Sequence, residues 1–113
     1  MPNGVFISHA SRDAEIAMTV CRLLEERGLR CWIARRDATP GRDWADEIPE
    51  AIGASESLVL IASEGTSEAP FVHRELTMAV DSGKPIFTLR VTNAELSKRV
   101  RFLVGTGTWV DAW

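Results

Sequence analysis

The chain contains few cysteines, and their placement limits the covalent and metal chemistry that it can support. Cys21 and Cys31 are the only two among 113 residues, and each lies in an apolar segment with no CxxC pair and no neighbouring histidine. A chain of this length hides roughly two-thirds of its unfolded surface on folding, enough for one core without disulfides or structural metal. We therefore expect two reduced, buried thiols rather than a bridge or a metal site.

Long apolar runs and an excess of charge are also missing. The longest uncharged apolar run, residues 58–62, is far shorter than the roughly 20 residues of a membrane helix, and the N-terminus lacks a basic-then-apolar signal pattern. Thirteen basic and sixteen acidic side chains leave a formal charge of −3, so the composition does not favour phosphate backbones or anionic lipid. We expect a cytoplasmic protein that binds neither nucleic acid nor membrane.

What the sequence does contain is an alternation of short apolar runs and amphipathic stretches, in a composition typical of a globular domain. Apolar runs that suit strands buried on both faces occupy residues 4–8, 30–34, 57–63, 84–91 and 106–110. Helical patterns lie between them: from the cap Ser11 to the stop signal Gly28, over 44–52, from Pro70 to Gly83, and over 94–103.

This alternation predicts an α/β fold, because each pair of parallel strands needs a crossover connection. We expect a five-stranded parallel sheet in the order 2-1-3-4-5 with helices on both faces, formed by residues 1–113 as a single domain. The sequence stops at Trp113, just past the last strand, with no helix left to cover that end of the sheet. We therefore expect the chain to be the N-terminal part of a longer protein.

Caps and periodicity also predict local features. Ser11 is a suitable N-cap, and the first helix is expected to pack inward through the stripe Ile16, Val20, Leu23 and Leu24. The polar stretch 35–44 predicts a loop that is longer than a simple connection needs.

Proline and periodicity shape the second and third predicted helices. Asp43 is expected to cap the second helix, and Pro49 is expected to break or delay it. In the helix that begins at Pro70, the predicted inward stripe is Val72, Leu76, Ala79 and Val80.

The predicted strand order also locates a ligand site. The order reverses between the first and third strands, so ligands are expected beyond their carboxyl ends, near Ser8 and Ser63. In the helix after the third strand, Glu75 falls at the edge of the buried face, one turn after Phe71. Such a carboxylate suits the stabilisation of a cation formed during a reaction. The alternative is a boundary acid paired with a nearby arginine.

Five ordered blocks of this sequence resemble a bacterial Toll/interleukin-1 receptor (TIR) domain. They are VFISHASRD at 5–13, the loop 37–44, IPEAI at 48–52, LVLIAS at 58–63 and FVHRE at 71–75. Together they span most of the chain, in order. The resemblance implies a flavodoxin-like fold.

Many bacterial and plant TIR domains, and some animal ones, cleave the nicotinamide glycosidic bond of NAD. The resemblance implies that Glu75 is the catalytic glutamate and that Phe71 occupies a position where tryptophan is common. Nicotinamide leaves as a neutral molecule, so this bond needs no general acid, unlike an ordinary glycoside. We therefore expect an NAD+ nucleosidase of the glycohydrolase or ADP-ribosyl cyclase type, with NAD+ as substrate, no cofactor and no metal.

The resemblance also implies roles for the segments around Glu75. The 8–12 loop is expected to contact ribose or phosphates, and the substrate-binding set comprises Ser8, His9, Arg12, Trp44, Ser63 and Phe71. The polar loop is expected to act as a lid and contact surface, through Arg35, Arg36, Asp37, Pro40, Gly41, Arg42 and Asp43.

Activity in this family often depends on assembly, because a neighbouring subunit completes the dinucleotide site. The resemblance therefore implies homotypic TIR–TIR self-association, triggered by a fused C-terminal sensor or oligomerising domain. NAD loss or ADP-ribose release would then serve antiphage signalling in bacteria. Two alternatives stay open: a non-catalytic adaptor that binds other TIR domains through the same loop, and an effector that mimics host TIR domains.

Overall fold

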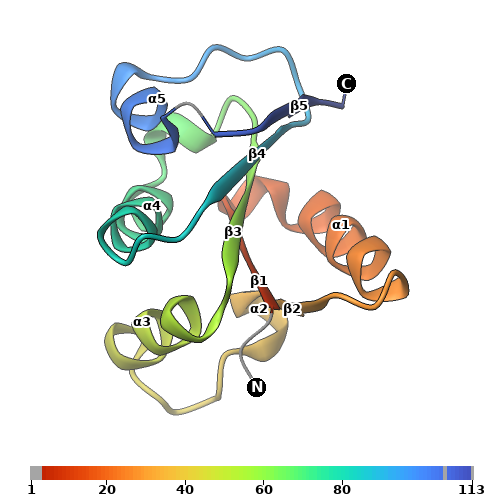
Figure 1. Cartoon of the computed structure of the whole chain (residues 1–113), viewed down its shortest axis with the longest axis vertical. Coiled ribbons are helices and arrows are strands. Elements are labelled where there is room, and N and C mark those ends of the chain that lie inside the picture. Colours follow the sequence, from red (N-terminus) through yellow and green to blue (C-terminus); the bar gives the residue numbers. More distant parts are fainter. Residues whose placement is uncertain (1–3, 106, 113) are drawn as a thin grey trace.

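A five-stranded sheet forms the centre of the computed structural model, which describes residues 4–105 and 107–112 (Figure 1). The strands are β1 (Gly4–His9), β2 (Arg30–Trp32), β3 (Ser57–Ala62), β4 (Ile86–Arg90) and β5 (Trp109–Asp111). Neighbouring strands are parallel and follow the order β2-β1-β3-β4-β5. The predicted fold class and strand order are confirmed.

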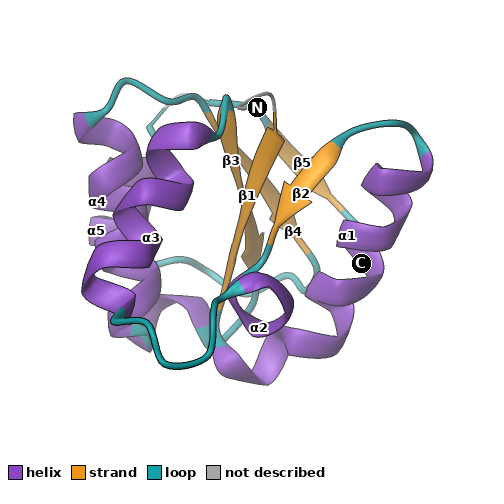
Figure 2. Cartoon of the chain, turned by 90° about the horizontal axis from the view of Figure 1, so that it is seen from below, coloured by secondary structure: helices purple, strands orange, loops and turns teal. Residues whose placement is uncertain are grey.

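Helices pack against both faces of this sheet, as Figure 2 shows. On one face lie α3 (Trp44–Ala54), α4 (Pro70–Asp81) and α5 (Lys98–Val104), and on the other lies α1 (Ala14–Glu26). Short helical turns, η1 (Ser11–Asp13), α2 (Ala34–Asp37) and η2 (Thr66–Glu68), lie within the connections. Among the described residues, no helix combines the length and apolar character needed to cross a membrane.

Two apolar clusters hold the layers together, one on each side of the sheet. Under α3, α4 and α5, Phe6 and Leu60 pack with Ile52, Leu76 and Val100. Under α1, the cluster comprises Val5, Ile7, Ala17, Cys21, Ile33 and Ile61. The central strands read as unbroken apolar runs because both of their faces are buried.

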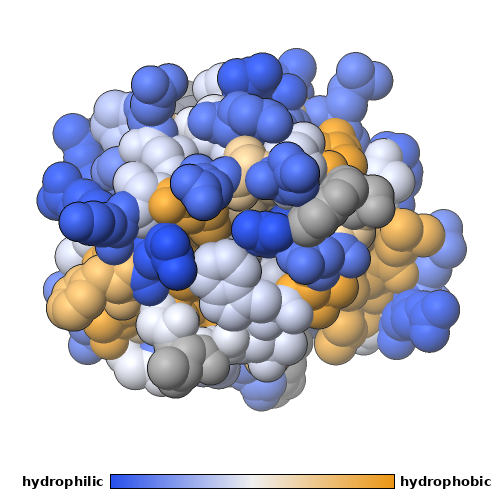
Figure 3. All heavy atoms as spheres, turned by 90° about the horizontal axis from the view of Figure 1, so that it is seen from above, coloured by the Kyte–Doolittle hydropathy of each residue, from blue (hydrophilic) through white to orange (hydrophobic). Residues whose placement is uncertain are grey.

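The surface over α5 and β5 is mainly hydrophilic. Figure 3 shows charged side chains spread across this face, with apolar atoms in separate patches between them.

The two cysteines are free, as predicted, although Cys31 is half-buried rather than buried like Cys21.

The inward face of α1 differs from the predicted one. Ala17 and Cys21 are fully buried, whereas Ile16 and Leu23 are 39% and 55% exposed. Val20 and Leu24, the other two predicted residues, are half-buried and pack against the same cluster, so the predicted stripe is correct in part. Ser11 does not cap α1, because it begins the turn η1 and α1 starts three residues later, at Ala14.

The helix α3 runs through Pro49, where a break or late start was predicted. Proline removes the amide that would bond to the carbonyl of Ala45, and this loss is confined to one turn. Burial of Ile48 and Ile52, 5% and 1% exposed, offsets it. Asp43 caps α3 as predicted, because its carboxylate accepts a hydrogen bond from the Ala45 amide at 2.9 Å.

Several predicted boundaries also shift. The polar stretch 35–44 is not all loop, because it begins in the helical turn α2, which Asp37 closes by accepting a hydrogen bond from the Ile33 amide at 2.9 Å. The helix α5 begins at Lys98 rather than 94, because Ser97 caps it by accepting from the Val100 amide. Thr106, the predicted start of the last strand, lies outside the described residues.

Candidate functional site

A cavity of about 450 Å³ opens beside the carboxyl end of β1, where the strand order reverses between β1 and β3. The switch-point rule predicts ligands at this end of the sheet, and the end of β1 lines the cavity, whereas β3 and the turn after it do not. Its walls come from the end of β1, from α2 with residues 38–42, and from the facing sides of α3 and α4. The volume falls in the range of small-molecule sites.

Glu75 is the buried acid of this cavity. Its side chain lines the cavity, yet the residue is only 8% exposed. The Ser8 hydroxyl donates a hydrogen bond to its Oε1 at 2.7 Å. Burial raises the pKa of Glu75 to about 7, although the Ser8 hydrogen bond acts in the opposite direction.

The position of Glu75 follows from the packing of α4. Pro70 occupies the first turn of the helix, and Val72, Leu76 and Ala79 are fully buried against the sheet. Val80 is 46% exposed, so the predicted inward stripe is one residue too wide. Glu75 lies at the edge of the buried stripe, as the helical periodicity predicts.

Glu75 is not paired with an arginine among the residues that the structure describes. Arg74 is exposed, and its guanidinium carbon lies 5.4 Å from the centre of the Phe71 ring. The alternative interpretation, in which Glu75 is a surface-boundary acid, required an ion pair between Glu75 and a nearby arginine. The geometry therefore favours a Glu75 carboxylate that faces the cavity and forms no ion pair with an arginine.

Two aromatic side chains form one wall of the cavity. The rings of Trp44 and Phe71 meet edge to face, with centroids 5.6 Å apart, and the residues are 47% and 53% exposed. A second, more apolar cavity of about 520 Å³ continues past them between α3 and α4, and Glu75 borders it too. Glu75 therefore lies between two cavities, of which the one between α3 and α4 has the more apolar lining.

The residues after β1 divide into different roles. His9 lines the cavity, and its Nδ1 lies 2.7 Å from the carbonyl oxygen of Ala10. A carbonyl can only accept, so Nδ1 carries the proton and Nε2 is an acceptor in the neutral ring. Arg12 borders a neighbouring cavity of about 370 Å³, which His9 and Phe71 also line.

Ser63, a predicted substrate contact, makes a buried hydrogen bond instead of lining the Glu75 cavity. Its hydroxyl donates to Asp13 at 2.6 Å and ties the turn after β1 to the end of β3. Ser8 is likewise fully buried and reaches the cavity only through Glu75. Both serines therefore position neighbouring side chains through buried hydrogen bonds and do not line the cavity themselves.

The polar loop contributes part of its predicted residues to the cavity. Arg35, Pro40, Gly41 and Arg42 line it, whereas Arg36, Asp37 and Asp43 do not. Arg42 forms an exposed ion pair with Glu50 at 2.8 Å. Within the described part of the chain, Arg35 has no ion-pair partner.

Sequence reasoning missed Glu47, which anchors this loop. Glu47 is 7% exposed, and its carboxylate accepts hydrogen bonds from the amide and the hydroxyl of Thr39, each at 2.8 Å. These hydrogen bonds lower the pKa of Glu47. The signal was present, because Glu47 precedes the buried Ala51 by one helical turn and so shares its face.

Chemically, the site is a single carboxylate at the border of a cavity with an aromatic wall. A carboxylate removed from water attracts a cation far more strongly than one in bulk solvent. The guanidinium of Arg35 adds donors that suit phosphate groups, and Nε2 of His9 can accept a hydrogen bond from a hydroxyl group. The arrangement therefore fits an anionic ligand with a positively charged reacting centre.

Comparison with known proteins gives consistent matches. A family model described as "TIR domain" matches residues 5–113. The TIR domain of the Toll-related receptor TRR-2 from Hydra magnipapillata has a similar structure, with a TM-score of 0.82 and 25% identity over 95% of this chain and 82% of that one. No curated protein matches the chain.

Two more distant structures are similar in fold. A metazoan TIR-STING receptor from C. gigas in complex with 2',3'-cGAMP has a TM-score of 0.76 and 24% identity over 95% of this chain and 34% of that one. The TIR domains of the activated Roq1 resistosome have a TM-score of 0.71 and 17% identity over 81% of this chain and 59% of that one. This chain corresponds to about a third of the receptor.

Proposed function

The chain belongs to the TIR domain family, and from this premise and the geometry around Glu75 we propose that it cleaves NAD+ at the bond between nicotinamide and ribose. The observation that carries the proposal is the cavity-facing carboxylate, 8% exposed and held by Ser8. Its burial and position suit a group that stabilises a short-lived cation.

The proposed reaction converts NAD+ and water into ADP-ribose, nicotinamide and one proton. The bond between the ribose C1' and the pyridinium nitrogen breaks, and its electron pair neutralises that nitrogen. Positive charge moves to the ribose, where the Glu75 carboxylate stabilises it. A water oxygen then bonds to C1', and its proton passes to solvent. The reaction proceeds without a metal or a resident cofactor.

The cavity walls suggest how the dinucleotide lies. Phe71 and Trp44 border the nicotinamide ring, because aromatic faces pack well against a flat heterocycle. Arg35 and His9, which line the same cavity, contact the phosphates and the ribose hydroxyls. Arg12 extends this surface into the adjoining cavity.

We further propose that activity depends on self-association. Trp44 and Phe71 leave the apolar wall half-exposed, and a second copy packed against them would close the site. Clustering by a fused sensor or oligomerising domain would then switch on NAD+ cleavage in the cytoplasm. We place this switch in bacterial antiphage signalling.

The experiment is nicotinamide release from NAD+ by dilute, concentrated and artificially clustered protein. Glu75→Gln should abolish release in every state, while Glu56→Gln, an exposed glutamate at the opposite end of β3, should behave as wild type. Release by Glu75→Gln equal to wild type would show that the catalytic assignment is wrong. Self-association without release by any variant would support an adaptor instead.

A further inference from the structure

Outside the site cavity, three side chains with metal-binding chemistry come together where the end of α1 meets β2. Within the described residues, the ligand atoms of Cys21, Glu25 and Cys31 all lie within 4.8 Å of one another. Cys21 is fully buried, whereas Glu25 and Cys31 are half-buried. None of the three lines the cavity around Glu75, and the proposed cleavage of NAD+ does not use them.

The fold creates this cluster from residues that the sequence keeps apart. Cys21 and Glu25 are one helical turn apart and lie on the same face of α1. The chain then turns back through Gly28, whose φ of +88° suits glycine, and enters β2 beside the helix. This return brings Cys31 opposite the other two side chains.

Contrary to the expectation from the sequence, we propose that Cys21, Cys31 and Glu25 bind a thiophilic divalent cation of the zinc class. Two thiolates and one carboxylate are ligands that zinc accepts in proteins, and water can supply the fourth. Zinc–sulfur bonds are about 2.3 Å long, so two sulfurs on one zinc lie about 3.8 Å apart. Because the present separations are at most 4.8 Å, the two sulfurs need to approach by no more than about 1 Å.

The binding step is balanced in atoms and charge. The cation forms two bonds to sulfur and one to a carboxylate oxygen, while the two S–H bonds break and their protons pass to water. No electrons are transferred. Because the double positive charge offsets the two thiolates, the total charge beside Arg36 and Asp37 does not change.

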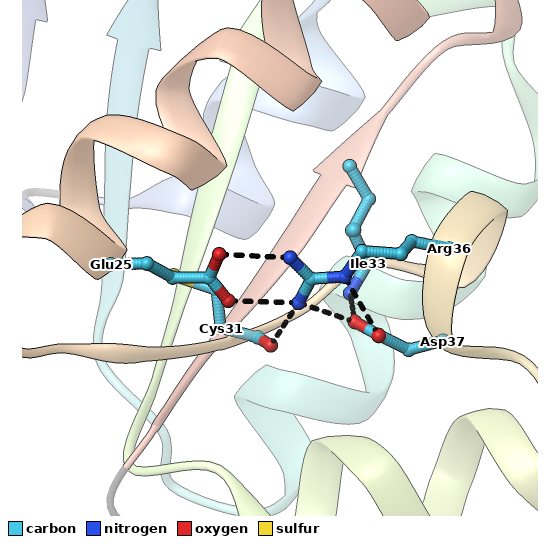
Figure 4. A network of polar contacts seen from close by, with 5 residues as sticks. All are labelled: Glu25, Cys31, Ile33, Arg36 and Asp37. Carbon is cyan, nitrogen blue, oxygen red and sulfur yellow. Dashed lines mark hydrogen bonds and ion pairs between the residues drawn. The ribbon is translucent and has the colours of Figure 1, made fainter.

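Arg36 is the competitor for the carboxylate in this cluster. Its Nη1 and Nη2 donate to the two oxygens of Glu25 at 2.8 and 2.9 Å, and Nη2 also donates to the Cys31 carbonyl at 3.0 Å. Figure 4 shows its guanidinium between the carboxylates of Glu25 and Asp37. A cation at the two sulfurs must attract Glu25 away from this pair. Removing the guanidinium should therefore strengthen metal binding.

The test is a titration of the chain, kept reduced by a phosphine, with cobalt(II), followed by displacement with zinc(II). We expect one cobalt per chain with thiolate-to-cobalt charge-transfer absorption, lost in Cys31→Ser. Glu25→Gln should weaken binding about tenfold, and Arg36→Gln should strengthen it about fivefold. Glu26→Gln, an exposed neighbour on α1, is the matched control and should bind as wild type.

These variants test whether the three side chains bind the metal ion together. Cys31 is substituted rather than Cys21 because it is half-buried, whereas substitution of the buried Cys21 could prevent folding. The proposal is wrong if reduced wild-type protein gives no charge-transfer absorption, or if Cys31→Ser retains it. It is also wrong if Glu25→Gln binds cobalt as tightly as wild type. A fall in affinity in Arg36→Gln would contradict the competition.

Discussion

Replacing Glu75 by glutamine should change how stability depends on pH. Glutamine has nearly the same shape and keeps an oxygen that can accept the Ser8 hydrogen bond, but it carries no charge. In the folded protein the pKa of Glu75 is raised to about 7, from an ordinary value of 4.5. This difference corresponds to about 3 kcal/mol of destabilisation when the carboxyl is fully ionised.

The sign follows from where the proton binds. Below the unfolded pKa the acid is neutral in both states, and its burial carries no charge penalty. As the pH rises from 4.5 towards about 7, the unfolded chain ionises first, so folding stability falls. Above the folded pKa the penalty is constant. Wild type should therefore lose stability across this window, whereas Glu75→Gln should not.

Urea unfolding of both proteins at about pH 5 and about pH 8 measures this effect. The stability of Glu75→Gln relative to wild type should rise by about 2.5 kcal/mol between the two pH values. The exposed Glu56→Gln should show no comparable change. An unchanged difference between Glu75→Gln and wild type at the two pH values would refute the desolvated carboxylate, independently of any enzyme activity.

Three further outcomes test the site. Ser8→Ala removes the hydrogen bond that favours the ionised acid, so the acidic limb of the pH profile for NAD+ cleavage should move to higher pH. Glu47→Gln should speed hydrogen exchange at the Thr39 amide about fivefold, as measured by mass spectrometry or NMR. As the pH rises past 7 and Glu75 ionises, the affinity of the protein for NAD+ should increase. Its affinity for NADH should increase less, because NADH lacks the pyridinium charge, and calorimetry measures both.

The sheet was predictable because its signal is local and strong. Unbroken apolar runs at 4–8 and 57–63 indicate strands buried on both faces, and their spacing leaves room only for crossover helices. The errors arise where tertiary packing overrides local rules. Pro49 is accommodated because Ile48 and Ile52 are buried around it, and the fully buried contacts of α1 come from small side chains such as Ala17.

The candidate site was predictable only in part, because its contacts join distant segments. Periodicity alone locates Glu75 at the border of its helix, but Ser8, its hydrogen-bond donor, is 67 residues away in sequence. The same holds for Ser63, which bonds to Asp13 across 50 residues. The nearness of Cys21 and Cys31 also depends on how a helix meets a strand, which residue spacing alone does not indicate.

The border placement of Glu75 explains how one acid can serve both the fold and the proposed chemistry. A fully exposed carboxylate would be screened by water and would attract a cation weakly. A fully enclosed one would keep its proton and meet no substrate. At 8% exposure, with fully buried Val72 and Leu76 beside it and Ser8 as its hydrogen-bond donor, Glu75 keeps one face towards the cavity. The desolvation that weakens the folded state above pH 7 is therefore the same effect that would strengthen its attraction for a ribose cation.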